Sequence, residues 1–116
     1  MKNQPLASRL RFAVNGIAAA WRNETSFRTQ CGAALLVLLV LLWRQPAALW
    51  WALLMMNCGM VLAAELLNTA LETTLDHLHP ARHPAIEVAK DCAAGAVLLL
   101  SLTGVVVFAA FVSASW

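Results

Sequence analysis

The chain has 116 residues, of which 61% are hydrophobic and 12% are charged. This is more apolar surface than one small water-soluble core can hide, so the composition excludes an ordinary soluble domain and indicates an integral membrane protein. The net charge of +2 is too small and too scattered for nucleic-acid binding, and it suits contact with anionic lipid headgroups instead.

The first element expected is an amphipathic helix over residues 6–26. Apolar side chains recur there at spacings of three and four, while arginines occupy mostly other positions of the helical wheel; the apolar positions are Leu6, Leu10, Ala13, Ile17 and Trp21. A helix that lies on the cytoplasmic membrane surface fits this pattern. A plain membrane anchor without a catalytic duty fits it equally well.

Three membrane spans are expected at about residues 28–45, 47–75 and 86–115, since a helix needs about 20 residues to cross a hydrocarbon layer roughly 30 Å thick. The first span ends at Arg44, whose long side chain can reach the interface, and Trp50 and Trp51 suit the aromatic belt at the start of the second. Pro80 and Pro84 break the helix between the last two spans. The predicted fold class is therefore all-α, as one membrane domain with three transmembrane helices and an N-terminal surface helix.

The basic residues predict the orientation of the chain. Lys and Arg are concentrated before the first span and around residues 77–90, and no charged residue follows Asp91. Under the positive-inside rule, the N-terminus and the connection at 77–90 lie in the cytoplasm, and the C-terminus lies on the opposite side.

Four polar side chains interrupt the second span, at Glu65, Asn68, Glu72 and Asp76. Residues at these spacings share one face of an α-helix, because each residue advances about 100° around the axis. Carboxylates that face lipid cost several kcal/mol each, so this face must point into protein or water. A functional site is the favoured reading, and the alternative is that these acids only hold neighbouring helices together by hydrogen bonds.

Further charged groups are expected near this face. Lys90 and Asp91, at the start of the third span, should lie close to Asp76 at one membrane face, and Glu24 closes the surface helix. Carboxylates near a cation suit Mg²⁺, which takes one or two of them together with phosphate oxygens and water, whereas no zinc-type spacing is present.

Three spans cannot easily surround a water-accessible site alone, so a homo-oligomer is expected.

Three histidines lie close together in the connection between the last two spans: His77, His79 and His83. Solvated loop side chains, a metal site and contact with a nucleotide or lipid headgroup all remain open for them.

Several segments resemble the prokaryotic diacylglycerol kinase family, which also contains undecaprenol kinases. They are "RFAVNGI" at 11–17, "WRNETSFR" at 21–28, "ELLNTALE" at 65–72 and "AKDCAAGAVLL" at 89–99, with Asp76 and the "HP" pair at 83–84 between the last two. The similarity covers roughly residues 11–107, nearly the whole chain.

The resemblance implies a homotrimer of three-span subunits, with active sites between subunits at the cytoplasmic side of the bacterial inner membrane. It implies Mg²⁺-dependent transfer of the ATP γ-phosphoryl group to a lipid hydroxyl. Glu65 would be the general base and Asn68 its orienting partner, Glu24 and Glu72 would hold Mg²⁺ with the ATP phosphates, and Lys90 and Asp91 would contact the nucleotide.

Other candidate positions follow from the same resemblance. Phe12 stands where an aromatic ring could flank the nucleotide, and His83 is a candidate nucleotide contact. Arg28 and Ala94, with Glu65, are candidate substrate contacts, although the small apolar segment around Ala94 offers contact only through backbone or shape. Asp76 would lie near the site.

The expected reaction converts diacylglycerol to phosphatidic acid, and undecaprenol is the alternative substrate. A proton or cation pathway is a competing hypothesis from a different class, because intramembrane acids often form relays. It predicts acids spread through the full membrane depth, whereas these gather toward one face. A noncatalytic assembly subunit is a further alternative, and it predicts no consumption of ATP with any lipid alcohol.

Overall fold

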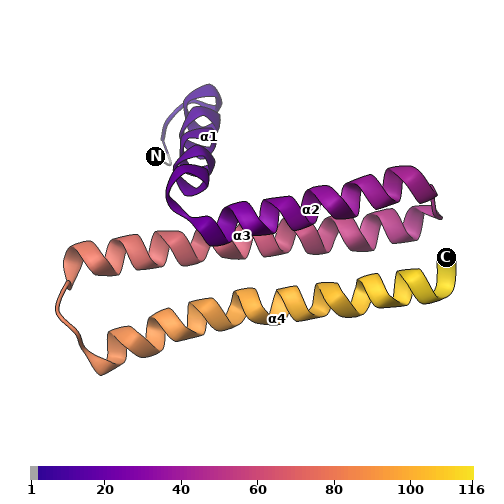
Figure 1. The fold of residues 1–116 in the computed structure, drawn as a ribbon. Coiled ribbons are helices and arrows are strands. Elements are labelled where there is room, and N and C mark those ends of the chain that lie inside the picture. Colours follow the sequence, from indigo (N-terminus) through magenta and orange to yellow (C-terminus); the bar gives the residue numbers. More distant parts are fainter. Residues whose placement is uncertain (1–2) are drawn as a thin grey trace.

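The computed structural model describes residues 3–116, and this part of the chain is helical throughout, with no β-strand. Its four helices are α1 (Leu6–Asn23), α2 (Thr25–Arg44), α3 (Ala48–Leu78) and α4 (Pro84–Ser115). Helices α2, α3 and α4 run along one another as an antiparallel bundle, and α1 projects away from its axis (Figure 1).

Three of these helices are long and apolar enough to cross a membrane. They are α2, α3 and α4, with 20, 31 and 32 residues. A helix needs about 20 residues to span the hydrocarbon layer, so the last two extend beyond it into the headgroup region. The predicted set of three apolar spans preceded by a separate N-terminal helix is confirmed.

The corner between α1 and α2 lies at Glu24, earlier than the expected helix end at residue 26. Glu24 has an extended backbone (φ −121°, ψ 108°), and α2 starts directly after it. Arg28 donates through Nη1 to the carbonyl oxygens of Trp21 and Arg22, at 2.6 and 3.2 Å. These carbonyls end α1 and have no partner within that helix, so Arg28 stabilises the corner by satisfying them.

The turn between α2 and α3 is tight and sits over a small core. Gln45 adopts the left-handed conformation (φ 46°) and its backbone N–H donates to the carbonyl of Leu41 at 2.8 Å, which ends α2. Leu41, Leu54 and Phe111, one from each long helix, form the buried cluster beneath this turn. This packing fixes the three helices together at the end of the bundle far from α1.

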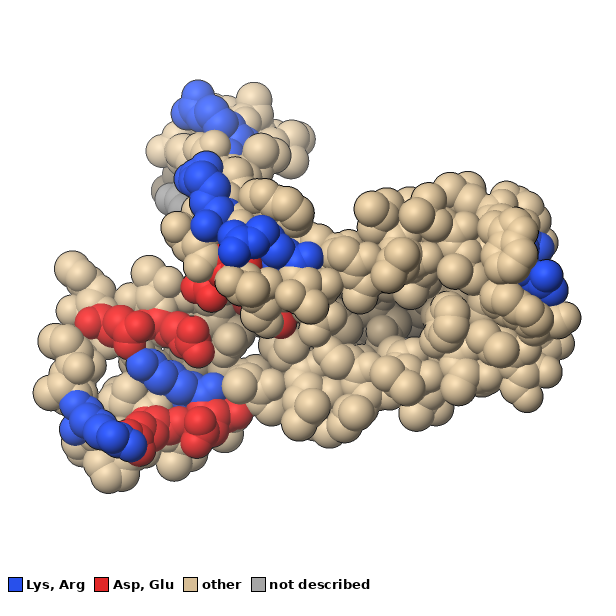
Figure 2. All heavy atoms as spheres, viewed as in Figure 1, with Lys and Arg blue, Asp and Glu red and all other residues tan. Residues whose placement is uncertain are grey.

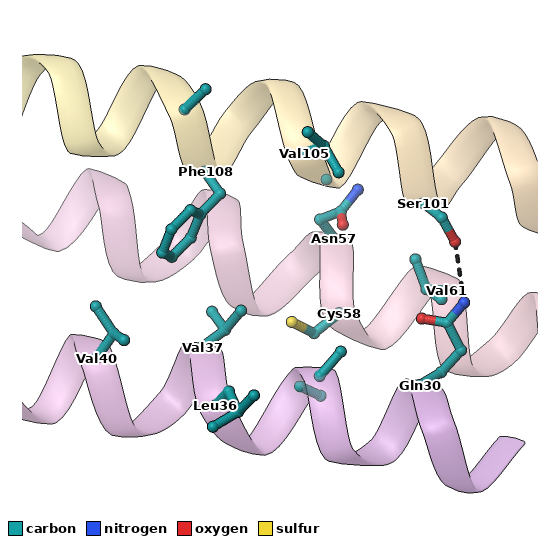
Figure 3. A pocket seen from close by; sticks show the side chains of 14 residues that line it. Gln30, Leu36, Val37, Val40, Asn57, Cys58, Val61, Ser101, Val105 and Phe108 are labelled. Atoms are coloured by element: carbon teal, nitrogen blue, oxygen red, sulfur yellow. Dashed lines mark hydrogen bonds between the residues drawn. The ribbon is translucent and has the colours of Figure 1, made fainter.

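The helices also meet at mid-depth through polar side chains around a largely apolar pocket of about 540 Å³ (Figure 3). Gln30 of α2 donates through Nε2 to Ser101 Oγ of α4 at 3.1 Å, and Asn57 of α3 donates through Nδ2 to the carbonyl of Leu100 at 3.2 Å. A Cβ atom on Gly104 would lie 2.4 Å from Asn57 Oδ1, so Asn57 holds this position on α3 only opposite a glycine of α4.

Candidate functional site

The charges of the molecule gather at one end of the bundle. Figure 2 shows acidic and basic atoms clustered around the α1–α2 corner and the ends of α3 and α4 that are joined by the connecting loop. Between Arg28 and Glu65 the sequence has a single charged residue, Arg44, and after Asp91 it has none. The candidate site is therefore confined to the end that carries α1.

Glu65 is the innermost acid of this end. Its side chain lies on α3 and is only 2% exposed. The hydroxyl of Ser26 donates to Glu65 Oε1 at 2.6 Å, from the first turn of α2 just past the corner at Glu24. The corner thus positions the donor that a buried carboxylate requires. Ser26 was not predicted as a site residue, because one serine in an apparently continuous helical segment gives no pattern.

The predicted polar face of α3 becomes more exposed along its length. After Glu65, Asn68 and Glu72 are half-buried and Asp76 is exposed. The Oδ1 atom of Asn68 is buried and has no hydrogen-bond donor within residues 3–116. A buried amide oxygen without a partner is uncommon and marks a position where a donor from another molecule can bind.

Asp76 is linked to α4 by an ion pair. Lys90 Nζ donates to Asp76 Oδ1 at 2.5 Å, so the expected proximity of these two residues is confirmed. Asp91 follows Lys90 on α4 and is exposed, as is Ala94 one turn further on. A second ion pair, between Arg82 and Glu87, lies where the connecting loop enters α4. A cation and several carboxylates are thus presented at the same end as Glu65.

The remaining candidates on α1 and α2 lie around the corner. Glu24 is the half-buried corner residue itself, and Arg28 is half-buried and bonded to the end of α1. Phe12 is half-buried on α1, with the guanidinium carbon of Arg11 at 5.5 Å from its ring centroid. Arg28 therefore has a structural role that the sequence did not reveal.

The histidine cluster has a local explanation. His83 caps α4, because its Nδ1 atom accepts from the backbone N–H of Ala85 at 3.1 Å. His79 Nδ1 lies 2.8 Å from the carbonyl oxygen of Ala81, and the rings of His79 and His83 meet edge to face at 5.8 Å. His77 is exposed in the last turn of α3. Turn and cap formation accounts for two of the three.

A groove of about 480 Å³ runs between α1 and α3, beside the polar face. Its walls are small and apolar on α1, with Ala13, Gly16 and Ala20, while α3 contributes hydroxyl groups from Thr69 and Thr73. Both threonines neighbour Asn68 and Glu72 in sequence. The groove therefore has mostly apolar walls, with hydroxyl groups on the α3 side.

The donor set of this end suits a hard cation bound together with phosphate. Within the described residues, no three His, Cys, Asp or Glu side chains come together as a complete metal site. Mg²⁺ typically takes only one or two protein carboxylates and fills its octahedron with phosphate oxygens and water. The half-buried carboxylates of Glu24 and Glu72 fit that requirement.

Comparisons with known proteins place the chain among membrane lipid kinases. The family described as prokaryotic diacylglycerol kinase matches residues 11–112. The diacylglycerol kinase of Escherichia coli (strain K12) is 32% identical over 95 residues, covering 82% of this chain and 78% of that protein. The undecaprenol kinase of Bacillus subtilis (strain 168) is 33% identical over 95 residues, covering 82% and 77%. The diacylglycerol kinase of Synechocystis sp. is 38% identical over 100 residues, covering 84% of this chain and 56% of that protein.

Proposed function

Because the chain belongs to the prokaryotic diacylglycerol kinase family, a family of membrane lipid kinases, we propose that it transfers the γ-phosphoryl group of ATP to the hydroxyl of diacylglycerol, giving phosphatidic acid. The observation that carries the proposal is the buried carboxylate of Glu65, held by Ser26 at the end of the bundle where the acidic side chains gather.

Glu65 acts as the general base. A lipid hydroxyl is a weak nucleophile, so its proton passes to the carboxylate as the new O–P bond forms and the bond from the γ-phosphorus to the bridging oxygen of ADP breaks. The hydrogen bond from Ser26 fixes one carboxylate oxygen, and Asn68, one turn further along α3, orients the base or the substrate hydroxyl. Ser26 is thus a positioning residue.

Electrostatic stabilisation comes from cations, because the charge on the transferring group must be neutralised. Glu24 and Glu72 would hold Mg²⁺ with the ATP phosphates, and the bound ion would neutralise phosphate charge. Lys90 approaches the phosphates from α4, with Asp76 fixing its position, while Asp91, Phe12 and His83 contribute to nucleotide contact.

Replacing Glu72 by Gln is expected to weaken Mg²⁺-dependent ATP binding, because one carboxylate ligand of the ion is lost. Isothermal titration at several Mg²⁺ concentrations measures the change. Unchanged metal dependence would contradict the role of Glu72.

The lipid alcohol reaches Glu65 along the groove between α1 and α3. Helix α1 presents a row of exposed apolar side chains, Leu6, Leu10, Val14, Ile17 and Trp21, at helical spacing. A helix with such a row lies at the membrane interface, where the hydroxyl of a diacylglycerol is also located. Arg28 and Ala94 are retained as proposed substrate contacts, although neither of them lines this groove.

The working form is a homotrimer in the bacterial inner membrane, with the N-terminus in the cytoplasm and the C-terminus on the opposite side. The large exposed apolar side chains of α2 and α4, such as Leu36, Leu99 and Val106, favour contact with lipid and with further copies. Active sites between subunits would use those contacts.

Undecaprenol is the second candidate substrate, since a relative of equal similarity is an undecaprenol kinase. Both substrates present a hydroxyl on an apolar body, so the groove accepts either in principle.

The test supplies the purified full chain with labelled ATP, Mg²⁺ and diacylglycerol, undecaprenol or no lipid. Label in phosphatidic acid supports the proposal. Label only in undecaprenyl phosphate would mean that undecaprenol is the substrate, and no transfer to either lipid would contradict the kinase function.

A further inference from the structure

A cation in contact with two aromatic rings lies at the end of the bundle opposite the candidate site. Arg44 is the last residue of α2, and its guanidinium carbon is 4.5 Å from the ring centroid of Trp116 and 5.4 Å from that of Trp43. The two indole rings meet edge to face at 5.4 Å. These three residues, here called the Arg44 cluster, join the end of α2 to the end of α4, where Figure 2 shows basic atoms separated from all other charges.

The Arg44 cluster has no acidic partner within the described part of the chain. The ion pairs of residues 3–116 are Arg82 with Glu87 and Lys90 with Asp76, all at the other end of the bundle. A second copy inserted in the same orientation supplies no side-chain carboxylate here either, because no acid lies between Glu24 and Glu65 or after Asp91. No acidic side chain within residues 3–116 therefore supplies a counter-charge for Arg44.

The guanidinium also has an unused hydrogen-bond donor. Arg44 Nε is buried and has no acceptor within residues 3–116. The indole faces stabilise the positive charge, but an N–H in the guanidinium plane still needs an oxygen acceptor, and leaving it without one costs stability. An anion with several oxygens in the plane of the guanidinium would satisfy both the charge and the donor.

The position of the cluster identifies the source of that anion. Tryptophan side chains are enriched at the membrane interface, where the lipid phosphates lie, and Trp43, Trp50 and Trp116 all occur at this end. Arginine recognises phosphate through paired N–H groups. We propose that the Arg44 cluster is a binding site for the phosphate group of an anionic phospholipid, in the leaflet opposite the candidate active site.

Native mass spectrometry of the full chain, released from detergent with increasing phosphatidylglycerol, tests this site. A charge-assisted hydrogen bond is worth about 1.5–3 kcal/mol, so Arg44→Gln is expected to weaken the tightest phosphatidylglycerol association about tenfold or more. Arg44→Lys keeps the charge but lacks the paired N–H groups of the guanidinium, so it should weaken phosphatidylglycerol binding by an intermediate factor. Arg82→Gln, which removes one exposed positive charge at the other end, is the matched control and should change the association little.

Competition with inorganic phosphate and with phosphatidylcholine identifies the ligand. Loss of binding in Arg44→Gln, with persistent phosphatidylglycerol binding in millimolar inorganic phosphate and weaker binding of phosphatidylcholine, supports the lipid site. Equal losses in Arg44→Gln and Arg82→Gln would reduce the effect to general charge attraction and overturn the proposal. Displacement of the lipid by free phosphate would overturn the assignment to a lipid. If Arg44→Gln does not fold, the same comparisons made with Arg44→Lys decide.

Discussion

Glu65 is the acidic side chain that the fold buries most completely, and its hydrogen bond explains how the chain tolerates it. A buried carboxylate without a donor would be strongly destabilising, and the Ser26 hydroxyl at 2.6 Å supplies one. The same bond restricts the rotation of the carboxylate. Stability and, in the proposed mechanism, catalytic geometry therefore depend on one contact between α2 and α3.

Replacing Ser26 by Ala tests this contact. Hydrogen bonds to charged groups are worth about 1.5–3 kcal/mol, so kcat is expected to fall about tenfold while the KM for ATP stays the same. Steady-state kinetics with varied ATP separates the change in kcat from any change in KM.

Ser26→Thr keeps the hydroxyl and provides the matched control. It should restore most of the activity. Equal kcat for Ser26→Ala and the unmodified chain would show that the hydroxyl is only structural.

At the scale of the elements, the approach of α3 to α4 depends on Gly104. A Cβ atom at this position would lie 2.4 Å from Asn57 Oδ1, which no side-chain contact tolerates without movement. Gly104→Ala is expected to destabilise the bundle by about 1–3 kcal/mol, because the helices must separate or Asn57 must lose its bond to Leu100. Thermal unfolding in detergent measures the change.

Gly95 offers the control on the same helix, since nothing lies within 4 Å of a Cβ built there. Gly95→Ala should leave stability unchanged or raise it by up to about 1 kcal/mol through helix propensity. Adding Asn57→Ala to Gly104→Ala should recover part of the loss by removing the clash. A Gly104→Ala chain as stable as Gly95→Ala would show that the close approach is not required.

The helices themselves were predictable, while their corners and cross-contacts were not. Long apolar runs and Pro84 predicted α2, α3 and α4, and the spacing from Glu65 to Asp76 predicted the shared polar face. Glu24 was expected to close the surface helix, as it does, but the expected range of that helix ran on to residue 26, because residues 21–28 contain no Gly or Pro to mark the corner. The partner of Glu65 depends on how α2 packs on α3, a tertiary contact that sequence periodicity does not encode.

At the scale of the whole molecule, one chain leaves most of its membrane-spanning surface uncovered. Helix α4 buries only Phe111 completely, and many of its large apolar side chains are exposed. Lipid can cover such a surface, but a hydrated site near Glu65 needs protein on more sides than three helices supply. In the proposed oligomer, further copies would meet that need, and residues of neighbouring chains would lie around each site.

Mixing two inactive variants tests whether sites are shared between subunits. Glu65→Gln and Asp91→Asn are each expected to lose most activity alone. The two variants are unfolded together and refolded as mixed oligomers. If a site takes Glu65 from one subunit and Asp91 from another, about a quarter of the sites will contain both unchanged residues, so up to about a quarter of full activity should return. Glu65→Gln mixed with Glu65→Ala is the control and should regain none. No recovery in the first mixture would mean that each chain supplies both residues to its own site.

The most direct test of the whole account compares the unmodified chain with Glu65→Gln for label transfer from ATP to the lipid and for ATP binding. General base catalysis contributes about 10²- to 10⁴-fold, so transfer should fall at least a hundredfold while ATP binds with unchanged affinity. Transfer at the original rate, or loss of ATP binding in place of transfer, would contradict the assignment of Glu65 as the base of a lipid kinase.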